Sequence, residues 1–134
     1  MSSVVADTHT IIWYLEASNQ LSDEAILALD KAIEDGNFIY ISAITLVEII
    51  YLVEKYRLPQ TALDQLNQAL SDPDIALSLV PLDAVIAQTL SQIPRDAVPD
   101  MPDRIIAATA LFLNLPLITR DSRIQTLKNI ETIW

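Results

Sequence analysis

Apolar residues along this chain fall into short runs that are typical of buried strands and longer stretches with helical spacing. Runs rich in β-branched and aromatic residues predict strands at 3–6, 38–41, 77–82 and 115–119, with a short last strand at 130–134. Helical stretches separate the first four. This alternation predicts an α/β fold, a three-layer sandwich with a central parallel sheet of four to five strands flanked by helices.

The helical stretches have recognisable start and stop residues. They are expected at 8–16, 21–36, 42–56, 61–70, 83–93 and 102–113. Ser22 is a good N-cap for the second, and Gly36 suits the left-handed position that ends it. Asn114 can end the last helix in the same conformation. No repeat or linker interrupts the pattern, so one domain spanning 1–134 is predicted.

The helix at 42–56 is apolar around nearly its whole circumference, which predicts that more than one face is covered. A homodimer interface is one expected use of the surplus apolar surface. Glu48 lies in this helix on the same face as Ile44 and Tyr51. A buried lone carboxylate is costly, so Glu48 should pair with an arginine of the C-terminal third, take up a proton or bind a cation.

Composition excludes several classes of site. The chain has no cysteine and one histidine, so thiolate zinc sites are excluded and any metal must be held by oxygen. Its single glycine, Gly36, rules out glycine-rich loops that hold nucleotide phosphates. The apolar runs are too short to span a membrane, and the start has no basic segment typical of a secretory signal. A soluble cytoplasmic protein is expected.

The formal charge of −10 is unevenly distributed. Residues 1–94 contain three basic residues against thirteen acidic ones, whereas residues 95–134 contain five of each. Nonspecific affinity for nucleic acid comes mainly from neutralising phosphates, so a chain this acidic needs local arginines, a bridging metal or a second subunit to bind one.

Four acidic residues follow apolar strands or lie in apolar helices: Asp7, Glu48, Asp103 and Asp121. Parallel strands bring their carboxyl ends to one edge of a sheet, and ligands bind there where the strand order reverses. The four carboxylates are therefore expected to converge. The three aspartates could equally be ordinary helix N-caps, and Asp100 could cap the helix that contains Asp103 or serve as an outer ligand.

A cluster of carboxylates favours a hard cation such as Mg²⁺ or Mn²⁺. Such ions activate water for the hydrolysis of phosphodiesters, which predicts a metal-dependent nuclease. His9 is expected to be a helix N-terminal hydrogen-bonding residue, with contact to the substrate as the alternative. The supporting residues predicted to bind water or phosphate are Thr119, Ser122, Arg104, Arg120 and Arg123.

Three segments, VVADTHTIIWYL, SAITLVEIIYLVEKYRL and PDMPDRIIAATALFLNLPLITRD, together resemble the PIN-domain family, particularly VapC-like toxins of bacterial type II toxin-antitoxin systems. The resemblance implies a PIN-like parallel sheet and a Mg²⁺- or Mn²⁺-dependent endoribonuclease that cuts RNA. It also implies a homodimer restrained by a small cognate antitoxin. By the same resemblance the catalytic and metal-binding residues are Asp7, Glu48, Asp103 and Asp121, supported by Thr119.

This chain departs from the family pattern at two places. Asn114 stands where a glycine is common, and VPDMPDR replaces the more usual arginine-Asp-Pro-Phe-Asp-Arg version. Other function classes stay open: a non-catalytic PIN-like interaction module, or a PIN nuclease of RNA processing that is not a toxin. A phosphoacceptor signalling domain is disfavoured, because the chain lacks paired aspartates after the first strand and a lysine after the fourth.

Overall fold

A computed structural model describes residues 3–134, and its centre is one five-stranded sheet. All its strand pairs are parallel, in the order β3-β2-β1-β4-β5, which confirms the predicted α/β fold. The strands are β1 (Val4–Ala6), β2 (Ile39–Ser42), β3 (Leu77–Val80), β4 (Leu117–Ile118) and β5 (Thr132–Ile133).

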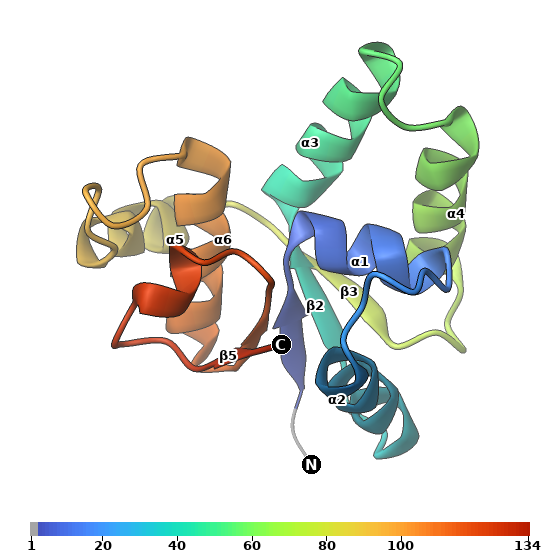
Figure 1. Cartoon of the computed structure of the whole chain (residues 1–134), viewed down its shortest axis with the longest axis horizontal. Helices are drawn as coiled ribbons and strands as arrows, with labels where there is room; N and C mark the ends of the chain where they lie inside the picture. The colour runs from blue at the N-terminus through green and yellow to red at the C-terminus, as the bar shows by residue number, and fades with distance from the viewer. Residues whose placement is uncertain (1–2) are drawn as a thin grey trace.

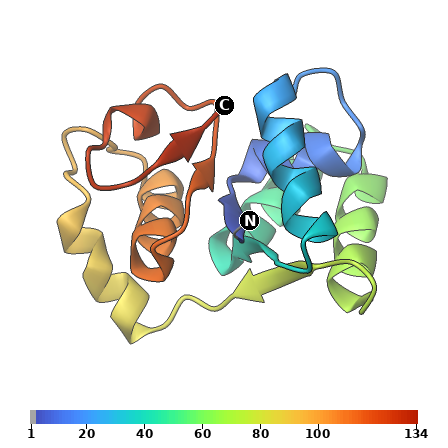
Figure 2. The same cartoon turned by 90° about the horizontal axis from the view of Figure 1, so that it is seen from below.

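Helices cover both faces of the sheet, as Figures 1 and 2 show. The helices are α1 (Thr8–Leu15), α2 (Asp23–Glu34), α3 (Ala43–Glu54), α4 (Gln60–Ser71), α5 (Ala84–Thr89) and α6 (Met101–Leu113). Helices α1, α2 and α4 pack on one face, and α5 and α6 on the other. Helix α3 follows β2 directly and contacts both α4 and α6, so it stands between the two layers.

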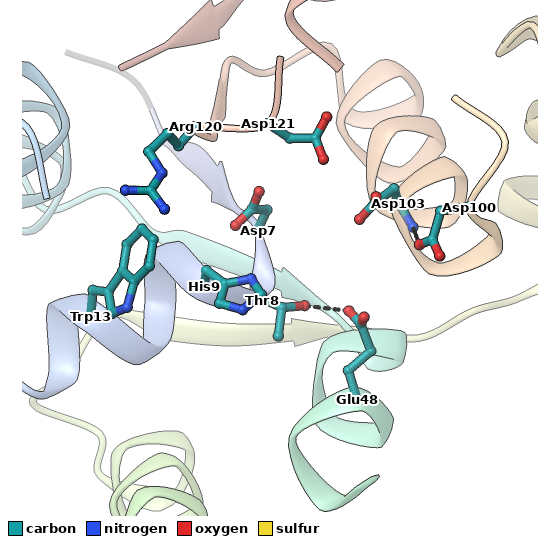
Figure 3. Close-up of a pocket in the computed structure, with 9 residues that line it drawn as sticks. All are labelled: Asp7, Thr8, His9, Trp13, Glu48, Asp100, Asp103, Arg120 and Asp121. Carbon is teal, nitrogen blue, oxygen red and sulfur yellow. Dashed lines mark hydrogen bonds between the residues drawn. The ribbon is translucent and has the colours of Figure 1, made fainter. Parts of the chain in front are cut away.

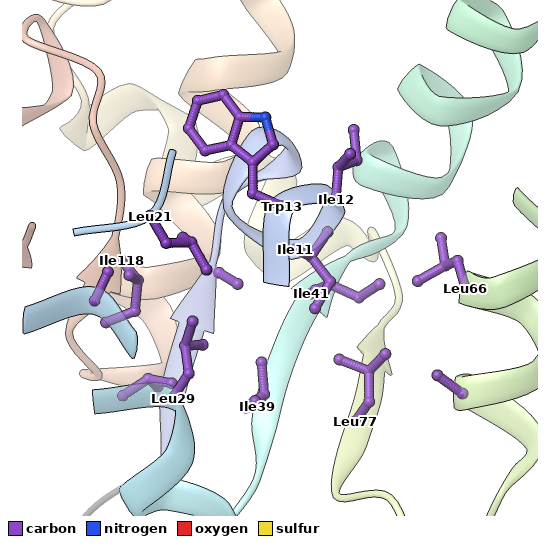
Figure 4. Close-up of a cluster of buried hydrophobic side chains, with 14 of the residues drawn as sticks. Ile11, Ile12, Trp13, Leu21, Leu29, Ile39, Ile41, Leu66, Leu77 and Ile118 are labelled. Carbon is purple, nitrogen blue, oxygen red and sulfur yellow. The ribbon is translucent and has the colours of Figure 1, made fainter. Parts of the chain in front are cut away.

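The two-residue period of β1 divides the core between the two faces. Val4 and Ala6 belong to the cluster under α1, α2 and α4, whereas Val5 belongs to the cluster under α6. Figure 4 shows the first cluster, in which Ile39 of β2 and Leu29 of α2 are fully buried. Each such side chain contributes about 1.5–3 kcal/mol relative to an exposed one.

The predicted caps are confirmed. The hydroxyl of Ser22 accepts from the backbone N–H of Ala25 at 3.0 Å. Gly36 has φ of 76°, and Asn114 has φ of 55° and ψ of 46°, so each occupies the left-handed conformation expected after a helix. Asn114 therefore replaces the family's usual glycine without loss of the helix end.

Some element bounds differ from the predictions. Strand β4 is two residues long instead of five, because its neighbours β1 and β5 pair with it only there. The helix predicted at 83–93 tightens into a 3₁₀ turn at Leu90–Gln92, and the segment after Asp121 forms only a 3₁₀ turn at Ile124–Thr126.

Residues 3–134 do not themselves supply the predicted cover of α3 on more than one face, and the homodimer interface expected there stays a prediction. Only Thr45 and Ile49 of this helix are fully buried. Val47 and Tyr51 are 45% and 57% exposed, so an apolar outer face meets solvent. Apolar periodicity shows how much surface a helix could bury and leaves open whether the same chain covers it.

Within residues 3–134, no helix has the length and apolar character needed to cross a membrane.

Candidate active site

The site lies where the order of the strands reverses. After β1 the chain adds β2 and β3 on one side and then returns to place β4 on the other side of β1. Crossover connections that leave β1 in opposite directions open a crevice at its carboxyl end. An open cleft of about 360 Å³ occupies this position. Its lining residues, shown in Figure 3, are Asp7, Thr8, His9, Trp13, Glu48, Asp100, Asp103, Arg120 and Asp121.

Asp7 directly follows β1 and is nearly fully buried. One of its carboxylate oxygens accepts from the backbone N–H of Thr10 at 3.1 Å, so the helix-cap role weighed from the sequence is present. Its other oxygen accepts from the hydroxyl of Thr119, a buried residue at the end of β4. These two bonds fix the carboxylate at the junction of the two central strands.

Asp121 is held from the β4 side. Its Oδ1 accepts from the backbone N–H groups of Arg123 and Ile124 at 2.8 and 3.0 Å, and its own N–H donates to the hydroxyl of Thr119 at 3.0 Å. Thr119 therefore connects Asp7 and Asp121 through one hydroxyl. Thr119 has no contact with solvent, so its hydroxyl orients the two carboxylates, and the predicted contact with water or phosphate stays a prediction.

Glu48 reaches the cleft from α3. The sequence suggested an arginine as one possible partner of Glu48. Within residues 3–134, its carboxylate instead accepts a hydrogen bond from the hydroxyl of Thr8 at 2.5 Å. Thr8 in turn shares a hydrogen bond of 3.1 Å with Thr45, one helical turn before Glu48. Burial raises the pKa of Glu48, the bond from Thr8 opposes that rise, and Asp100 adds to it.

Asp103 has the most clearly perturbed carboxyl group of the cleft. Burial is the main cause that raises its pKa to about 7, and Asp100, Asp121, Glu48 and Asp7 add to the rise by repulsion. Its neighbours on α6, such as Ala107, are small and fully buried, so the helix approaches the sheet closely. Asp100 is the N-cap of α6, accepting from the N–H of Asp103 at 3.1 Å, and it also lines the cleft.

The acids of the cleft face one another, and no lysine or arginine of residues 3–134 is paired with them. Between the residues that the structure describes, no lysine or arginine lies within 4.0 Å of the carboxylates of Asp7, Glu48, Asp103 or Asp121. Such a cluster favours protons or a cation, which is what the raised pKa values of Glu48 and Asp103 express.

The donor set fits a hydrated hard cation. In residues 3–134, no three of these groups are close enough to hold one ion directly. Mg²⁺ keeps several of its waters and is usually held by one or two carboxylates, so a spaced set of oxygen donors suits it. The cleft lacks the nitrogen and sulfur donors that zinc prefers, apart from His9.

The basic residues predicted to support the site occupy different places. Arg120 lines the cleft, with its guanidinium over the ring of Trp13 at 4.6 Å. Arg104 faces away: its guanidinium donates to the backbone carbonyl groups of Leu90 and Ile93 at 2.9 and 2.8 Å. The phosphate-binding role predicted for Arg104 is therefore replaced by a structural one, since these bonds hold the turn after α5 against α6.

Ser122 and Arg123 lie in the exposed turn after Asp121, outside the lining of the cleft. His9, also exposed, does line it. Two lining residues were missed by the sequence reasoning, Thr8 and Trp13. The sequence could have indicated Thr8 as a cleft residue because it immediately follows Asp7. Trp13 could not be told apart from an ordinary apolar residue of a helix.

The chain combines a parallel sheet with an acidic cleft where the order of the strands reverses. Known proteins that share these features define its family. The model of the PIN domain family matches residues 4–130, so the chain belongs to the PIN domain family. Among curated proteins, Ribonuclease VapC22 of Mycobacterium tuberculosis is 28% identical over 138 residues, and the match covers the whole of both chains.

Solved structures share the fold. VapBC2 from Rickettsia felis, bound to a DNA fragment from its promoter, has a chain with a TM-score of 0.72 and 20% identity, covering 98% of this chain and 97% of that one. A chain of a toxin-antitoxin complex from Klebsiella pneumoniae has a TM-score of 0.64 and 25% identity, covering 95% and 94%. These likenesses confirm the PIN-like, VapC-like architecture expected from the sequence.

Proposed function

We propose that this chain is a Mg²⁺- or Mn²⁺-dependent endoribonuclease and the toxin of a type II toxin-antitoxin pair, acting in the cytoplasm. The observation that supports this most directly is the cluster of four carboxylates, which within residues 3–134 have no lysine or arginine paired to them and in which burial raises the pKa of Asp103 to about 7. The cluster lies where the order of the strands reverses, which is where substrates of α/β proteins bind.

The cleft residues have separable roles in this proposal. Asp7, Glu48, Asp103 and Asp121 would hold the divalent cation, which when bound supplies an activated water and stabilises charge on the phosphate. Thr119 fixes the carboxylate of Asp7, and Thr8 fixes that of Glu48. Arg120 would bind a phosphate oxygen of the RNA.

The relatives support the choice of substrate and partner. The curated relative is called a ribonuclease, which favours RNA, and one structural relative at 25% identity is a toxin-antitoxin complex, which favours a small antitoxin as partner. The exposed apolar face of α3 supports a homodimer.

Cleavage of RNA tests the catalytic part. Purified protein with Mn²⁺ should cut single-stranded RNA, and the Asp7→Asn and Asp103→Asn variants should lose at least about a hundredfold in rate, since each removes a charge from the cation site. Asp83→Asn is a matched control, because Asp83 also caps a helix, accepting from Ile86 N–H at 3.0 Å, but lies outside the cleft. Full activity of the Asp7→Asn and Asp103→Asn variants would refute the mechanism.

Induced expression in bacteria tests the toxin part. Growth should stop on induction of the native chain and continue on induction of Asp7→Asn. Cleavage in vitro without any growth defect would instead assign the chain to the PIN nucleases of RNA processing. Absence of both cleavage and divalent-metal binding would make it a non-catalytic PIN-like interaction module.

A further inference from the structure

Arg120 is the one arginine or lysine that lines the acidic cleft in the part of the chain that the structure describes. It is adjacent in sequence to Asp121, yet its guanidinium makes no ion pair within 4.0 Å with Asp121 or Asp7. Instead the guanidinium carbon lies 4.6 Å from the centre of the Trp13 ring (Figure 3). The cation is thus kept on the rim of the cleft by an aromatic face.

A free cation at this position would compete with the proposed metal. An arginine able to reach the carboxylates would neutralise them, because opposite charges within a few ångströms attract strongly in a partly buried site. Guanidinium stacks on aromatic faces while its N–H groups stay available at the edge for a planar contact with phosphate. A guanidinium held over the Trp13 ring is kept off the acids, and the N–H groups at its edge can still donate to a phosphate.

Trp13 is suited to be a fixed platform. Its side chain is only 9% exposed and packs in the core cluster beneath α1. Its ring also meets His9 at 5.6 Å and Trp134 at 6.0 Å between ring centres, both tilted. With its ring fixed by these contacts, Trp13 offers Arg120 a rigid surface, so the position of the guanidinium is determined by the core.

We propose that Trp13 is a positioning residue, which stacks with Arg120 so that the guanidinium binds a phosphate of the RNA without neutralising the acidic cluster. This rests on the proposed nuclease function. Trp13 itself contacts neither the phosphate nor the cation, and acts only through Arg120.

A double-mutant cycle tests the proposal through binding of a short RNA that carries a non-cleavable phosphorothioate backbone, measured by fluorescence anisotropy without metal. Trp13→Leu should weaken binding roughly two- to fivefold, the effect of one exposed cation–π contact. Trp13→Phe, which retains an aromatic ring in the core, should show a smaller loss. In an Arg120→Gln background, Trp13→Leu should have no further effect. Arg120→Lys should not restore full affinity, because an ammonium cannot stack as a flat guanidinium does.

Calorimetry of Mn²⁺ binding supplies the second arm. Trp13→Leu should lower Mn²⁺ affinity, because the released Arg120 can reach the acids, and adding Arg120→Gln should restore it. The proposal is overturned if Trp13→Leu weakens RNA binding equally with and without Arg120, which is what a merely structural role predicts. It is also overturned if no Trp13 variant changes RNA binding. Absence of RNA cleavage by the native protein would refute the proposed function alone, since the binding cycle does not depend on turnover.

Discussion

The carboxyl group of Asp103 is disfavoured in its ionised form by burial and by the acids around it. Its pKa rises from 3.8 to about 7 on folding, so the folded protein holds this proton more tightly than the unfolded chain does. The tighter proton binding of Asp103 adds to the free energy of unfolding below about pH 4, and this contribution is lost as the pH rises through 7. A cation in the cleft would reverse the penalty.

Asp103→Asn should therefore stabilise the metal-free protein at neutral and higher pH. The pKa change corresponds to about 4 kcal/mol at full burial, and solvent screening of this partly exposed group reduces the expected gain to ~1–2 kcal/mol. Urea denaturation in EDTA should show this gain at pH 8 and a progressively smaller one as the pH falls toward 4. A variant that is less stable than the native protein at pH 8 would contradict the penalty that burial and the neighbouring acids impose on ionised Asp103.

Thr8 offers a second test at this scale. Thr8→Val keeps the shape of the side chain but removes the hydrogen bond to Glu48, so the pKa of Glu48 should rise further and its carboxylate should lose its orientation. Loss of such a supporting bond typically costs roughly tenfold in metal affinity. Titration with Mn²⁺ at several pH values should show this loss for Thr8→Val. Thr8→Ser retains the hydroxyl and should bind like the native protein; equal binding by both variants would contradict the role of Thr8.

Individual residues were predictable from the sequence to different degrees. Asp7 and Asp121 stand at the ends of apolar strands, and parallel strand ends must meet, so their proximity follows from local patterns. The bond from Thr8 to Glu48 joins residues 40 apart in the chain and depends on how α1 and α3 cross. Arg104 turns away from the cleft because it binds the backbone of the turn after α5. The position of that turn cannot be read from residue spacing.

At the scale of elements, helix type and position were largely predictable because caps and periodicity are local. Whether the outer face of α3 is buried could not be predicted. The same apolar spacing occurs in helices covered by their own chain, in helices covered by a second copy and in helices left exposed. This face, which includes Val47 and Tyr51, is exposed in the single chain. Natural monomers seldom expose contiguous apolar surface on a helix, which supports the proposed homodimer.

Tyr51→Glu should weaken self-association without unfolding the chain. A charge on an apolar interface should raise the dimer dissociation constant by roughly tenfold or more, about 1.4 kcal/mol. Sedimentation equilibrium measures this directly. Leu27→Glu is the matched control, because Leu27 is 66% exposed on α2, away from α3. Equal association of the two variants would place the interface elsewhere.

At the scale of the whole molecule, the fold gives a chain with a charge of −10 a place for the proposed RNA-binding site. The reversal of strand order places acids from β1, α3, α6 and the end of β4 around one cleft, with Arg120 on its rim. The overall parallel topology followed from alternating strands and helices. The depth of the cleft and the spacing of its acids required the three-dimensional packing, because they depend on the close approach of α6 to the sheet.

The central claim is that this cleft binds a divalent cation through its carboxylates. Isothermal titration of the metal-free protein with Mn²⁺ tests it most directly. Binding should be saturable in the native protein and in Asp83→Asn, and at least roughly tenfold weaker in Asp7→Asn. Absence of binding to the native protein, or equal binding by Asp7→Asn, would contradict the account.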